Sequence, residues 1–504
     1  MTVATLLRRF AAAALVFVLV GAVMVAYWRR TGASPAAGDL GLYLLALPLG
    51  LIGGYWLLRW GIDGRKAKTS AATAAATGAD VADDGPQPDR VLHLLAHAVL
   101  IPAGASAAEA VAALVEPKRP ALHPQFKDDG GMPVFAAAVD GVDPDAIAEA
   151  LREFLAAGSQ PHADIDAVFA EEHLRALALL EPVADELLQV ALAADADEMD
   201  PYARVAEVAP ASVLRVRLLL PVAWPVAARQ TAADWLLAKA TTIGYRVGHV
   251  SVDVIAVEAA SDVWRLLDQL GQARARESES GRDSDRHLLL GAHSLLAEAA
   301  IEQLSQQRPL LGSGRPEGMV PGEGAAGILI SASVAAVDGV ASVNPDVDLD
   351  VPLPLRLHRV SSAPALAGVP SRRVSQHAAD LLARSLVTAA QPAHAVAALL
   401  SDGDHRPSRA VELAGAMAIA LPDLDPIVHG LHLGIACGDL GAVAPLALIA
   451  AAAAQAEQSA APVLAISVAD DTLRFALAVS PLPMPANPVA DAPTRHAPAL
   501  AQPA

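Results

Sequence analysis

The sequence predicts an α/β fold, in which helices cover the sheets, preceded by two membrane-spanning helices. Three observations support this prediction: two uncharged apolar runs near the N-terminus, an alternation of strand-like and helix-like runs along the remainder, and a length of 504 residues. Strands separated by helical runs are typical of helix-covered sheets. A chain of this length has room for a large core.

The N-terminal 68 residues hold the two apolar runs. Residues 10–28 and 40–58 are uncharged, and each is about long enough to cross a bilayer. A signal peptide is an alternative interpretation of the first run, but no small-residue cleavage site follows and a second span comes directly. We therefore expect residues 1–68 to form an uncleaved two-helix hairpin. Aromatic residues near the ends of the runs suit the membrane interface: Tyr27, Trp28, Tyr55, Trp56 and Trp60.

The orientation of this hairpin follows from its basic residues. Six of them flank the hairpin, and only Arg29 and Arg30 lie in the loop between the spans. Because basic loops stay on the cytoplasmic side, the N-terminus and the C-terminal body are expected in the cytoplasm, at a bacterial-type inner membrane. A single cysteine fits that reducing compartment. The six flanking residues are Arg8, Arg9, Arg59, Arg65, Lys66 and Lys68.

The rest of the chain is acidic. Residues 69–504 carry 28 basic and 53 acidic side chains, a formal charge of −25. Such a body repels phosphate backbones and anionic lipid, so we expect no nucleic-acid partner. The negative charge also weakens the case for an acyl carrier protein as a partner, because carrier proteins are themselves acidic.

Composition divides this part of the chain further. Residues 69–88 are small, polar and acidic and read as a flexible linker, and the Pro/Ala-rich residues 481–504 as a disordered tail. The body then spans residues 89–480. Within it, residues 272–286 are charged throughout, which predicts a solvated loop.

Periodicity predicts the elements of the body in order. The last two strand-like runs flank Asp470 and Asp471, which predicts a hairpin. The strand-like runs are 91–101, 214–220, 249–257, 288–290, 325–333, 463–468 and 473–479. The helix-like runs are 107–115, 145–156, 171–180, 183–193, 231–240, 261–269, 297–307, 374–389 and 441–457.

Four segments carry a resemblance to a known family. VLHLLAHAVLIPAGASAAEAVAAL (91–114), GGMPVFAAAVDGVDPDA (130–146), PGEGAA (321–326) and GIACGDLGAVAPL (434–446) resemble segments of the thiolase-like superfamily, and within it the β-ketoacyl synthases. The resemblance implies a layered αβαβα fold of two similar halves that meet near residue 335. It also implies that Gly322, Glu323 and Gly324 form the family's motif loop, with Glu323 held by buried backbone donors.

The same resemblance puts the family's chemistry in doubt. Its enzymes form carbon–carbon bonds through a cysteine thiolate at the start of a helix, and the matching place holds Glu258 or Ala259. Asp439 stands where the family has its last histidine. In the region of the other family histidine, residues 401–412, His405 is the single imidazole. We therefore expect Ala259 and Asp439 to be degenerate positions and the chain to hold no catalytic residue.

Two nucleophilic side chains remain as candidates. Cys437 precedes a predicted helix, whose dipole would lower the pKa of its thiol, and His429 and His432 are near in sequence. The alternative is a small buried residue in a glycine-rich turn. For Ser261 no base is evident, and a helix N-cap is the expected role.

Other polar patterns give no cofactor or metal site. His93 and His97 lie four residues apart in a strand-like run without the glutamate of a zinc motif. Asp346, Asp348 and Asp350 alternate as in a solvated edge strand and lack the glycine and glutamate of a calcium loop. We expect no metal and no cofactor.

Two functions remain open. The first is a non-catalytic thiolase-like scaffold, adapter or modulator at the inner membrane, forming a homodimer or heterodimer through a sheet edge; a secretion-system accessory is one version, without a supporting motif. The second is an acyltransferase or acyl-thioester-binding partner of a lipid or polyketide condensing enzyme, which would engage acyl-CoA or an acyl carrier protein. Both rest on the resemblance and on fold-level analogy.

Overall fold

A computed structural model describes Arg30 and residues 91–482, apart from residues 129, 158–164, 199–212, 279–285, 313 and 332–354. Two compact units divide the chain, Met1–Asp83 and Asp84–Ala504, and nearly all described residues belong to the second. The predicted two-helix hairpin (Arg30 of its loop apart), the linker, nearly all of the tail and the aspartates at 346, 348 and 350 lie outside the described residues. No helix within the described part is both long and apolar enough to span a bilayer.

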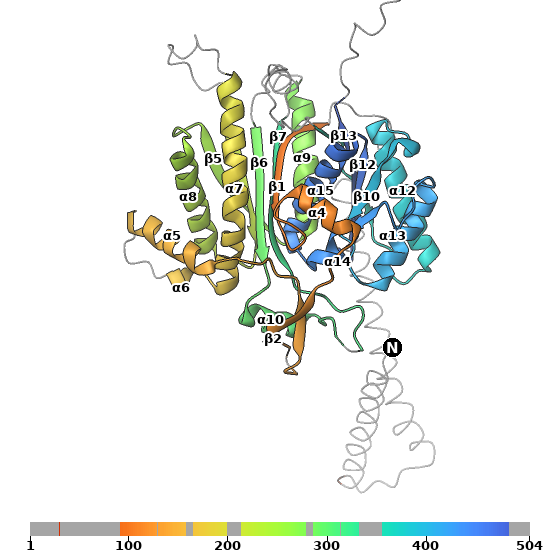
Figure 1. The fold of residues 1–504 in the computed structure, drawn as a ribbon, viewed down its shortest axis with the longest axis horizontal. Helices are drawn as coiled ribbons and strands as arrows, with labels where there is room; N and C mark the ends of the chain where they lie inside the picture. The colour runs from red at the N-terminus through yellow and green to blue at the C-terminus, as the bar shows by residue number, and fades with distance from the viewer. Residues whose placement is uncertain are drawn as a thin grey trace, which may run out of the picture. The chain divides into compact units, whose positions relative to one another are not determined.

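One mixed sheet of eleven strands crosses the described part of the second unit (Figure 1). Its order is β11-β10-β12-β13-β8-β1-β7-β6-β4-β5, with β9 beside β13, while β2 and β3 form a separate pair. The strands of the first half are β1 (Leu92–Leu100), β2 (Ala121–Lys127), β3 (Pro133–Ala136), β4 (Leu214–Pro221), β5 (Val250–Val257), β6 (Arg286–Ser294) and β7 (Glu323–Ser331). Those of the second are β8 (Leu355–Leu357), β9 (Ser361–Pro364), β10 (Ala398–Ser401), β11 (Gly430–His432), β12 (Val463–Ser467) and β13 (Leu473–Pro481).

The strand order repeats. The first half runs β5-β4-β6-β7-β1 and the second β11-β10-β12-β13-β8, and in each the fourth strand is antiparallel to its neighbours while the first three are parallel. The two halves meet where β1 pairs antiparallel with β8. Two topologically equivalent halves therefore share one continuous sheet.

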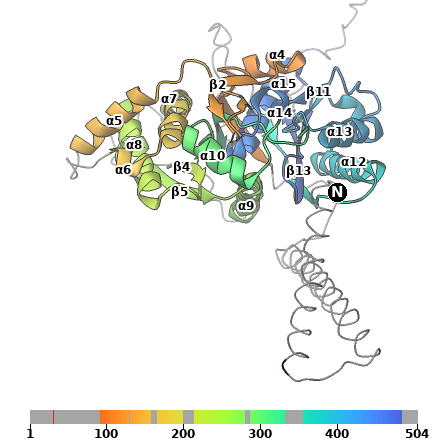
Figure 2. The ribbon, with the colours of Figure 1, turned by 90° about the horizontal axis from the view of Figure 1, so that it is seen from below.

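Helices cover both halves and fill the space between them. Helices α5, α7 and α8 pack on the outer face of the first half, α12 and α13 on that of the second, and α4, α9 and α15 form the layer between. In Figure 2 the two outer groups lie at opposite ends with α4 and α15 between them. The helices are α4 (Ala107–Val115), α5 (Pro144–Ala157), α6 (Ile165–Val168), α7 (Glu171–Glu198), α8 (Val226–Ile243), α9 (Ala260–Ser278), α10 (Glu298–Gln307), α12 (Ser371–Ala389), α13 (Pro407–Ala420), α14 (Leu433–Cys437) and α15 (Ala444–Ser459), with short turns η4 (Ala393–Ala395) and η5 (Gly441–Val443).

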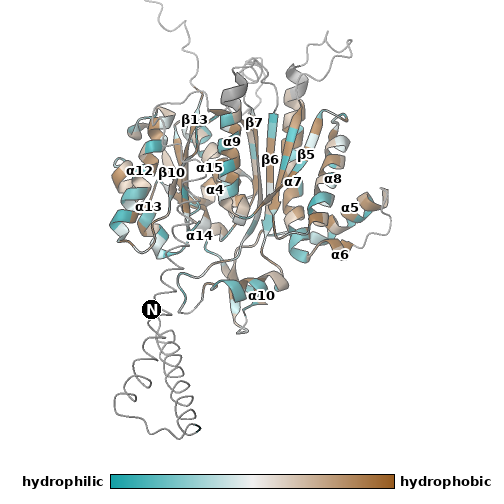
Figure 3. Cartoon of the chain, turned by 180° about the vertical axis from the view of Figure 1, so that it is seen from behind, coloured by the Kyte–Doolittle hydropathy of each residue, from teal (hydrophilic) through white to brown (hydrophobic). Residues whose placement is uncertain are grey.

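Side-chain size explains the middle layer. Half of helix α15 is alanine, and the helix is buried on nearly every side, so it contacts α4, α9 and strands of both halves. Small side chains allow that close approach on all faces at once. The outer helices instead show hydrophilic and hydrophobic residues side by side (Figure 3), as helices with one buried face do.

The predicted strands and most predicted helices are confirmed, including the β12–β13 hairpin. Two details were wrong. Helix α7 continues through Pro182, because the buried side chains on both sides of the proline offset one lost hydrogen bond. The charged run from residue 272 is helical to Ser278, and Arg286 is a buried residue of β6.

Candidate functional site

A cleft opens at the carboxyl ends of the parallel strands. It has a volume of about 590 Å³. Pro221 of β4, Val257 of β5 and His293 of β6 line one wall, while residues that follow β10 and β12, such as Asp402 and Ala469, line the other. Ligands of open α/β sheets bind at this end of the strands, so the cleft is the candidate site.

The cleft contains both positions that the resemblance marked as degenerate. Its lining comprises Pro221, Val257, Glu258, Ala259, Ala260, His293, Arg308, Pro309, Glu317, Met319, Asp402, Asp404, Arg406, Leu433, Gly434, Gly438, Asp439, Leu440, Gly441, Ala442, Ala444, Ala469, Asp470, Asp471 and Thr472. Ala259 and Asp439 are thus both wall residues of one cavity, although 180 positions separate them in the sequence.

The expected nucleophile position lies at the turn from β5 into α9. Glu258 and Ala259 form this turn, and a carboxylate oxygen of Asp262 accepts the N–H groups of both, at 2.9 and 3.2 Å. The turn therefore leads into a helix, as the resemblance implies for the nucleophile position. The side chains of Glu258 and Ala259, however, carry neither a thiol nor a hydroxyl. Ser261 lies inside the first turn of α9, so the predicted N-cap role was wrong and Asp262 satisfies the free N–H groups.

Asp439 connects the cleft to the motif loop. Its Oδ1 accepts the N–H of Gly441 at 2.8 Å, and its own N–H donates to the carbonyl of Val320 at 2.9 Å. Gly322 passes so close that a Cβ there would lie 2.1 Å from the carbonyl oxygen of Cys437. The PGEGAA loop therefore packs backbone to backbone against the segment that carries Asp439.

Glu323 does not line the cleft. Its carboxylate is fully buried and accepts the Nε and Nη2 of Arg175, at 2.5 and 2.8 Å. It also accepts the N–H of Val139 and the hydroxyl of Ser294. The expectation of buried backbone donors holds for one contact, but the main partner is a guanidinium group on α7, which the local sequence did not reveal.

Cys437 is sealed in the core. It is the last residue of α14, where the helix dipole disfavours a thiolate, and burial raises the pKa of its thiol to about 12. The structure therefore supports the interpretation of Cys437 as a small buried residue over that of an activated thiol. His432 hydrogen-bonds Ser401 at 2.7 Å, and His429 bonds within its own turn at Asp425, so in the described part of the chain neither imidazole is bonded to the thiol.

The region expected to hold a second histidine contributes aspartates to the cleft. Asp402 and Asp404 line it, whereas His405 does not. The buried Asp402 accepts the hydroxyl of Ser467 at 2.5 Å and the N–H groups of Val468 and Ala469. Burial raises the pKa of Asp402, against the lowering effect of these hydrogen bonds.

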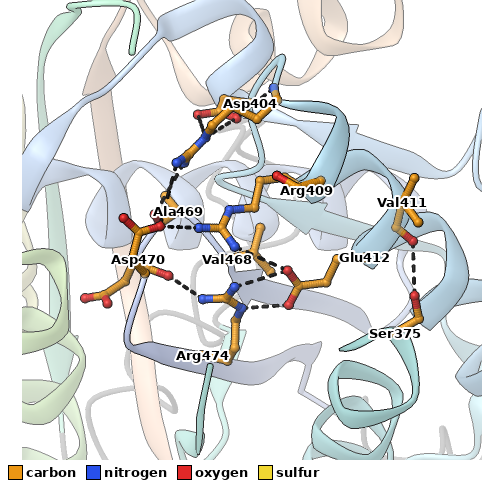
Figure 4. A network of polar contacts seen from close by, with 12 residues as sticks. Ser375, Asp404, Arg409, Val411, Glu412, Val468, Ala469, Asp470 and Arg474 are labelled. Carbon is orange, nitrogen blue, oxygen red and sulfur yellow. Dashed lines mark hydrogen bonds and ion pairs between the residues drawn. The ribbon is translucent and has the colours of Figure 1, made fainter. Parts of the chain in front are cut away.

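A network of ion pairs stiffens this wall (Figure 4). Arg406 pairs with Asp404 at 2.8 Å, and Arg409 pairs with Asp471 at 2.6 Å. Beneath them, the buried Arg474 donates to both carboxylate oxygens of Glu412, at 2.7 and 3.1 Å. The arginines of this wall are therefore already engaged by the protein's own carboxylates.

His293 is a cleft residue that sequence reasoning missed. It lies near the end of β6, and its ring packs over Gly441, where a Cβ would come within 2.7 Å of the imidazole. Burial lowers the pKa of His293, although Asp439 acts in the opposite direction. Its Nδ1 is buried and has no hydrogen-bond partner in the described part of the chain.

The charge of the cleft is strongly negative. Seven carboxylates line it against two guanidinium groups, those of Arg308 and Arg406. A phosphate-bearing thioester would meet repulsion here. Among the described residues no group of three histidine, cysteine or acidic side chains is arranged to hold a metal ion. His97 instead approaches Glu457 at 3.2 Å, and His93 is buried in β1.

Comparisons with known proteins identify the fold. No family model and no curated protein matches the chain. A type II polyketide ketosynthase, solved with its acyl-carrier protein and bound to a hexaketide, is 11% identical, with a TM-score of 0.50 over 79% of this chain and 100% of that one. The module 6 ketosynthase of the Bacillus subtilis bacillaene synthase is also 11% identical, with a TM-score of 0.50 over 78% of this chain and 72% of that one.

The chain therefore has the mixed α/β fold of thiolase-like ketosynthases. The expected fold class is confirmed to that extent. At 11% identity the likeness concerns the fold alone, and function has to be argued from the cleft.

Proposed function

We propose that this protein is a non-catalytic thiolase-like scaffold or adapter. The observation that carries the proposal is the cleft itself, which presents Ala259, Glu258 and Asp439 at the places expected for a nucleophile and a histidine. The expected position therefore offers no thiolate to accept an acyl chain. The single cysteine is buried with a pKa of about 12 and does not line the cleft.

The test is covalent loading of the purified full chain in detergent. After incubation with acetyl-, malonyl- or palmitoyl-CoA, intact-mass spectrometry is expected to give the unmodified mass. A stable acyl adduct on Cys437 or on any serine would overturn the proposal and favour the acyltransferase alternative. Copurifying acyl chains would favour the acyl-thioester-binding alternative.

A designed thiol provides the matched positive control. Ala259→Cys places a thiol at the cleft wall, whereas Cys437 is enclosed. Iodoacetamide is expected to label the variant once and the folded wild type not at all. Labelling of the variant shows that reagents reach the cleft, so an unmodified wild type then reflects the lack of a nucleophile and not an inaccessible cleft.

We further propose that residues 1–68 anchor the protein in the inner membrane with its body in the cytoplasm. The support is the pair of apolar runs and the six flanking basic residues. In intact cells a membrane-impermeant maleimide is expected to label Thr31→Cys, in the loop between the spans, but not Ala72→Cys in the linker. The reverse labelling pattern would contradict this topology.

For a partner we propose a second copy or a related thiolase-like chain, docked on strand β5. In the described part of the chain β5 ends the sheet with no strand beyond it, and Val252, Val254 and Ile255 are half-buried. An open edge of this kind pairs readily with another strand. Acyl carrier protein stays a weaker candidate because cleft and body are both acidic.

A further inference from the structure

An uncharged helix surface lies at the end of the sheet opposite β5, where α13 packs beside β10 and β11 (Figure 2). The buried side of α13 consists of Leu413, Ala416 and Met417. Solvent-facing sides of surface helices are normally polar or charged, but the exposed side of α13 carries no charge over three turns. Its exposed residues there are Ala410, Val411, Ala414, Ala418 and Ile419.

The loop between α13 and β11 extends this surface. Ile427 is 89% exposed and Val428 62% exposed. The turn that presents them is fixed, because the Oδ1 of Asp425 accepts the N–H of Ile427 at 2.8 Å. Loop and helix lie against each other, since a Cβ on Gly430 would lie 3.2 Å from the Sδ of Met417. We call the five exposed residues of α13 together with Ile427 and Val428 the α13 face.

The shape of the α13 face fits another helix. Ala410, Ala414 and Ala418 recur every four residues, so they form one line along α13. Small side chains along such a line let a second helix approach closely. The line is about 12 Å long, which corresponds to about two turns of a helix. Contiguous exposed apolar surfaces of this kind mark sites of interaction.

The charges beside the α13 face indicate which partner fits it. In residues 410–428, all of which the structure describes, the exposed charged side chains are Asp423 and Asp425. A second copy of the chain would bring the same two aspartates and the same acidic body, so like charges oppose self-pairing. Anionic lipid is repelled for the same reason. Lysine or arginine side chains beside an apolar helix surface are instead attracted.

We propose that the α13 face binds a basic amphipathic helix of a partner protein. The apolar side of that helix packs on Ala414, Ala418 and Ile427, and its basic side chains lie toward Asp423 and Asp425. The inference rests on the proposed scaffold or adapter function and gives that function a binding surface, separate from both the cleft and β5.

Fluorescence anisotropy on the full chain in detergent tests the proposal with a labelled basic amphipathic peptide, LKKLLKLLKKLLKL. Ala414→Lys and Ile427→Lys are each expected to bind it about tenfold more weakly than the wild type, because each puts a like charge into the apolar contact. Val247→Lys is the matched control, since it adds the same charge at a residue that is 92% exposed outside the α13 face. It should bind as the wild type does. The peptide enters the detergent micelle equally in all samples, so differences between variants report the protein surface.

A second probe tests the sign of the partner's charge. The acidic analogue LEELLELLEELLEL is expected to bind the wild type at least about tenfold more weakly than the lysine peptide does. Asp423→Asn should weaken binding of the lysine peptide about threefold, whereas Glu302→Gln, an exposed acid on α10, should not. Equal binding of the lysine peptide by wild type, Ala414→Lys and Ile427→Lys, or a preference for the acidic analogue, would overturn the proposal.

Photo-crosslinking in intact cells identifies the occupant of the α13 face. With p-benzoylphenylalanine in place of Ala418, the expected cross-link joins a different protein through a segment that has basic residues beside an apolar helical stripe. A cross-link to a second copy, to lipid or to a segment without that pattern contradicts the proposal, as does the absence of any cross-link. None of these results depends on acyl loading, so a failure here leaves the proposed non-catalytic function intact, and an acyl adduct leaves the α13 face intact.

Discussion

At the scale of single residues, two carboxylates shut off from solvent form ion pairs in the described part of the chain. Glu323 with Arg175 joins β7 to α7, and Glu412 with Arg474 joins α13 to β13. Removing water from such groups is costly, and the cost is recovered only while both partners stay in place. Each pair therefore fixes where a helix sits on the sheet.

Glu323→Gln is expected to lower stability by about 2 to 3 kcal/mol, because it leaves the guanidinium of Arg175 without a counter-charge in a partly buried position. The midpoint of urea unfolding, followed by tryptophan fluorescence, measures the change. Glu149→Gln breaks the exposed Arg152 pair and should shift stability by no more than about 0.5 kcal/mol. Equal shifts in the two variants would refute the role given to Glu323.

Acid is expected to destabilise the fold through His358. Burial, followed by the positive charge of Arg356, lowers the pKa of His358 to about 4 from 6.5. The unfolded chain therefore takes up a proton first as pH falls, and stability on the order of 3 kcal/mol is lost between pH 6.5 and pH 4.

Urea unfolding at half-unit pH steps measures this loss. His358→Gln removes the titrating group and should flatten the profile over that window. The exposed His394→Gln should keep the wild-type profile. A profile in His358→Gln as steep as that of the wild type would assign the acid sensitivity to other groups.

The candidate site was predictable only in part at this scale. Ala259 and Asp439 were found through the resemblance, because each follows a recognisable local pattern. His293 and Asp402 were missed, because what brings them to the cleft is the pairing of distant strands, β6 with β4 and β10 with β12. Two interpretations of Cys437 were left open, and its burial at the end of the five-residue helix α14 supports the small buried residue.

At the scale of elements, the loop before β7 depends on a residue without a side chain. Gly322 lies against the carbonyl oxygen of Cys437, and backbone groups there have little freedom to move aside. Gly322→Ala is expected to cost about 1 to 3 kcal/mol and to lower the thermal unfolding temperature. Gly312→Ala meets no atom within 4 Å and should be neutral; a neutral Gly322→Ala would show that this contact is loose.

Long elements were easier to predict than short ones. The apolar runs of β4 and β12 predict buried strands, and this prediction was confirmed. Strands β8 and β11 have three residues each and depend on neighbouring strands for their hydrogen bonds. β8 pairs with β1 and β13, and β11 pairs with β10. No local pattern encodes such dependence, so β8 and β11 were missed. The strands β2, β3, β9 and β10 were missed as well.

At the scale of the whole molecule, the proposed pairing through β5 predicts an oligomeric state. The wild-type chain in detergent is expected to be a dimer by light scattering with size-exclusion chromatography. Val254→Lys puts a charge on the half-buried edge strand and should yield monomers. Ile427→Lys, at an exposed loop before β11, should leave the dimer intact; a dimer that survives Val254→Lys would exclude this edge.

The pairing of β1 has a consequence for how this chain folds during its synthesis on the ribosome. β1 lies inside the sheet, between β7 and β8, yet its nearest partner in sequence, Ala325 opposite Leu100, is made 225 residues later. At roughly 5–20 residues per second, the strand waits many seconds with both edges unpaired. A strand left open for that time attracts chaperones or aggregates, so the yield of folded protein is expected to depend on holdases that bind nascent chains.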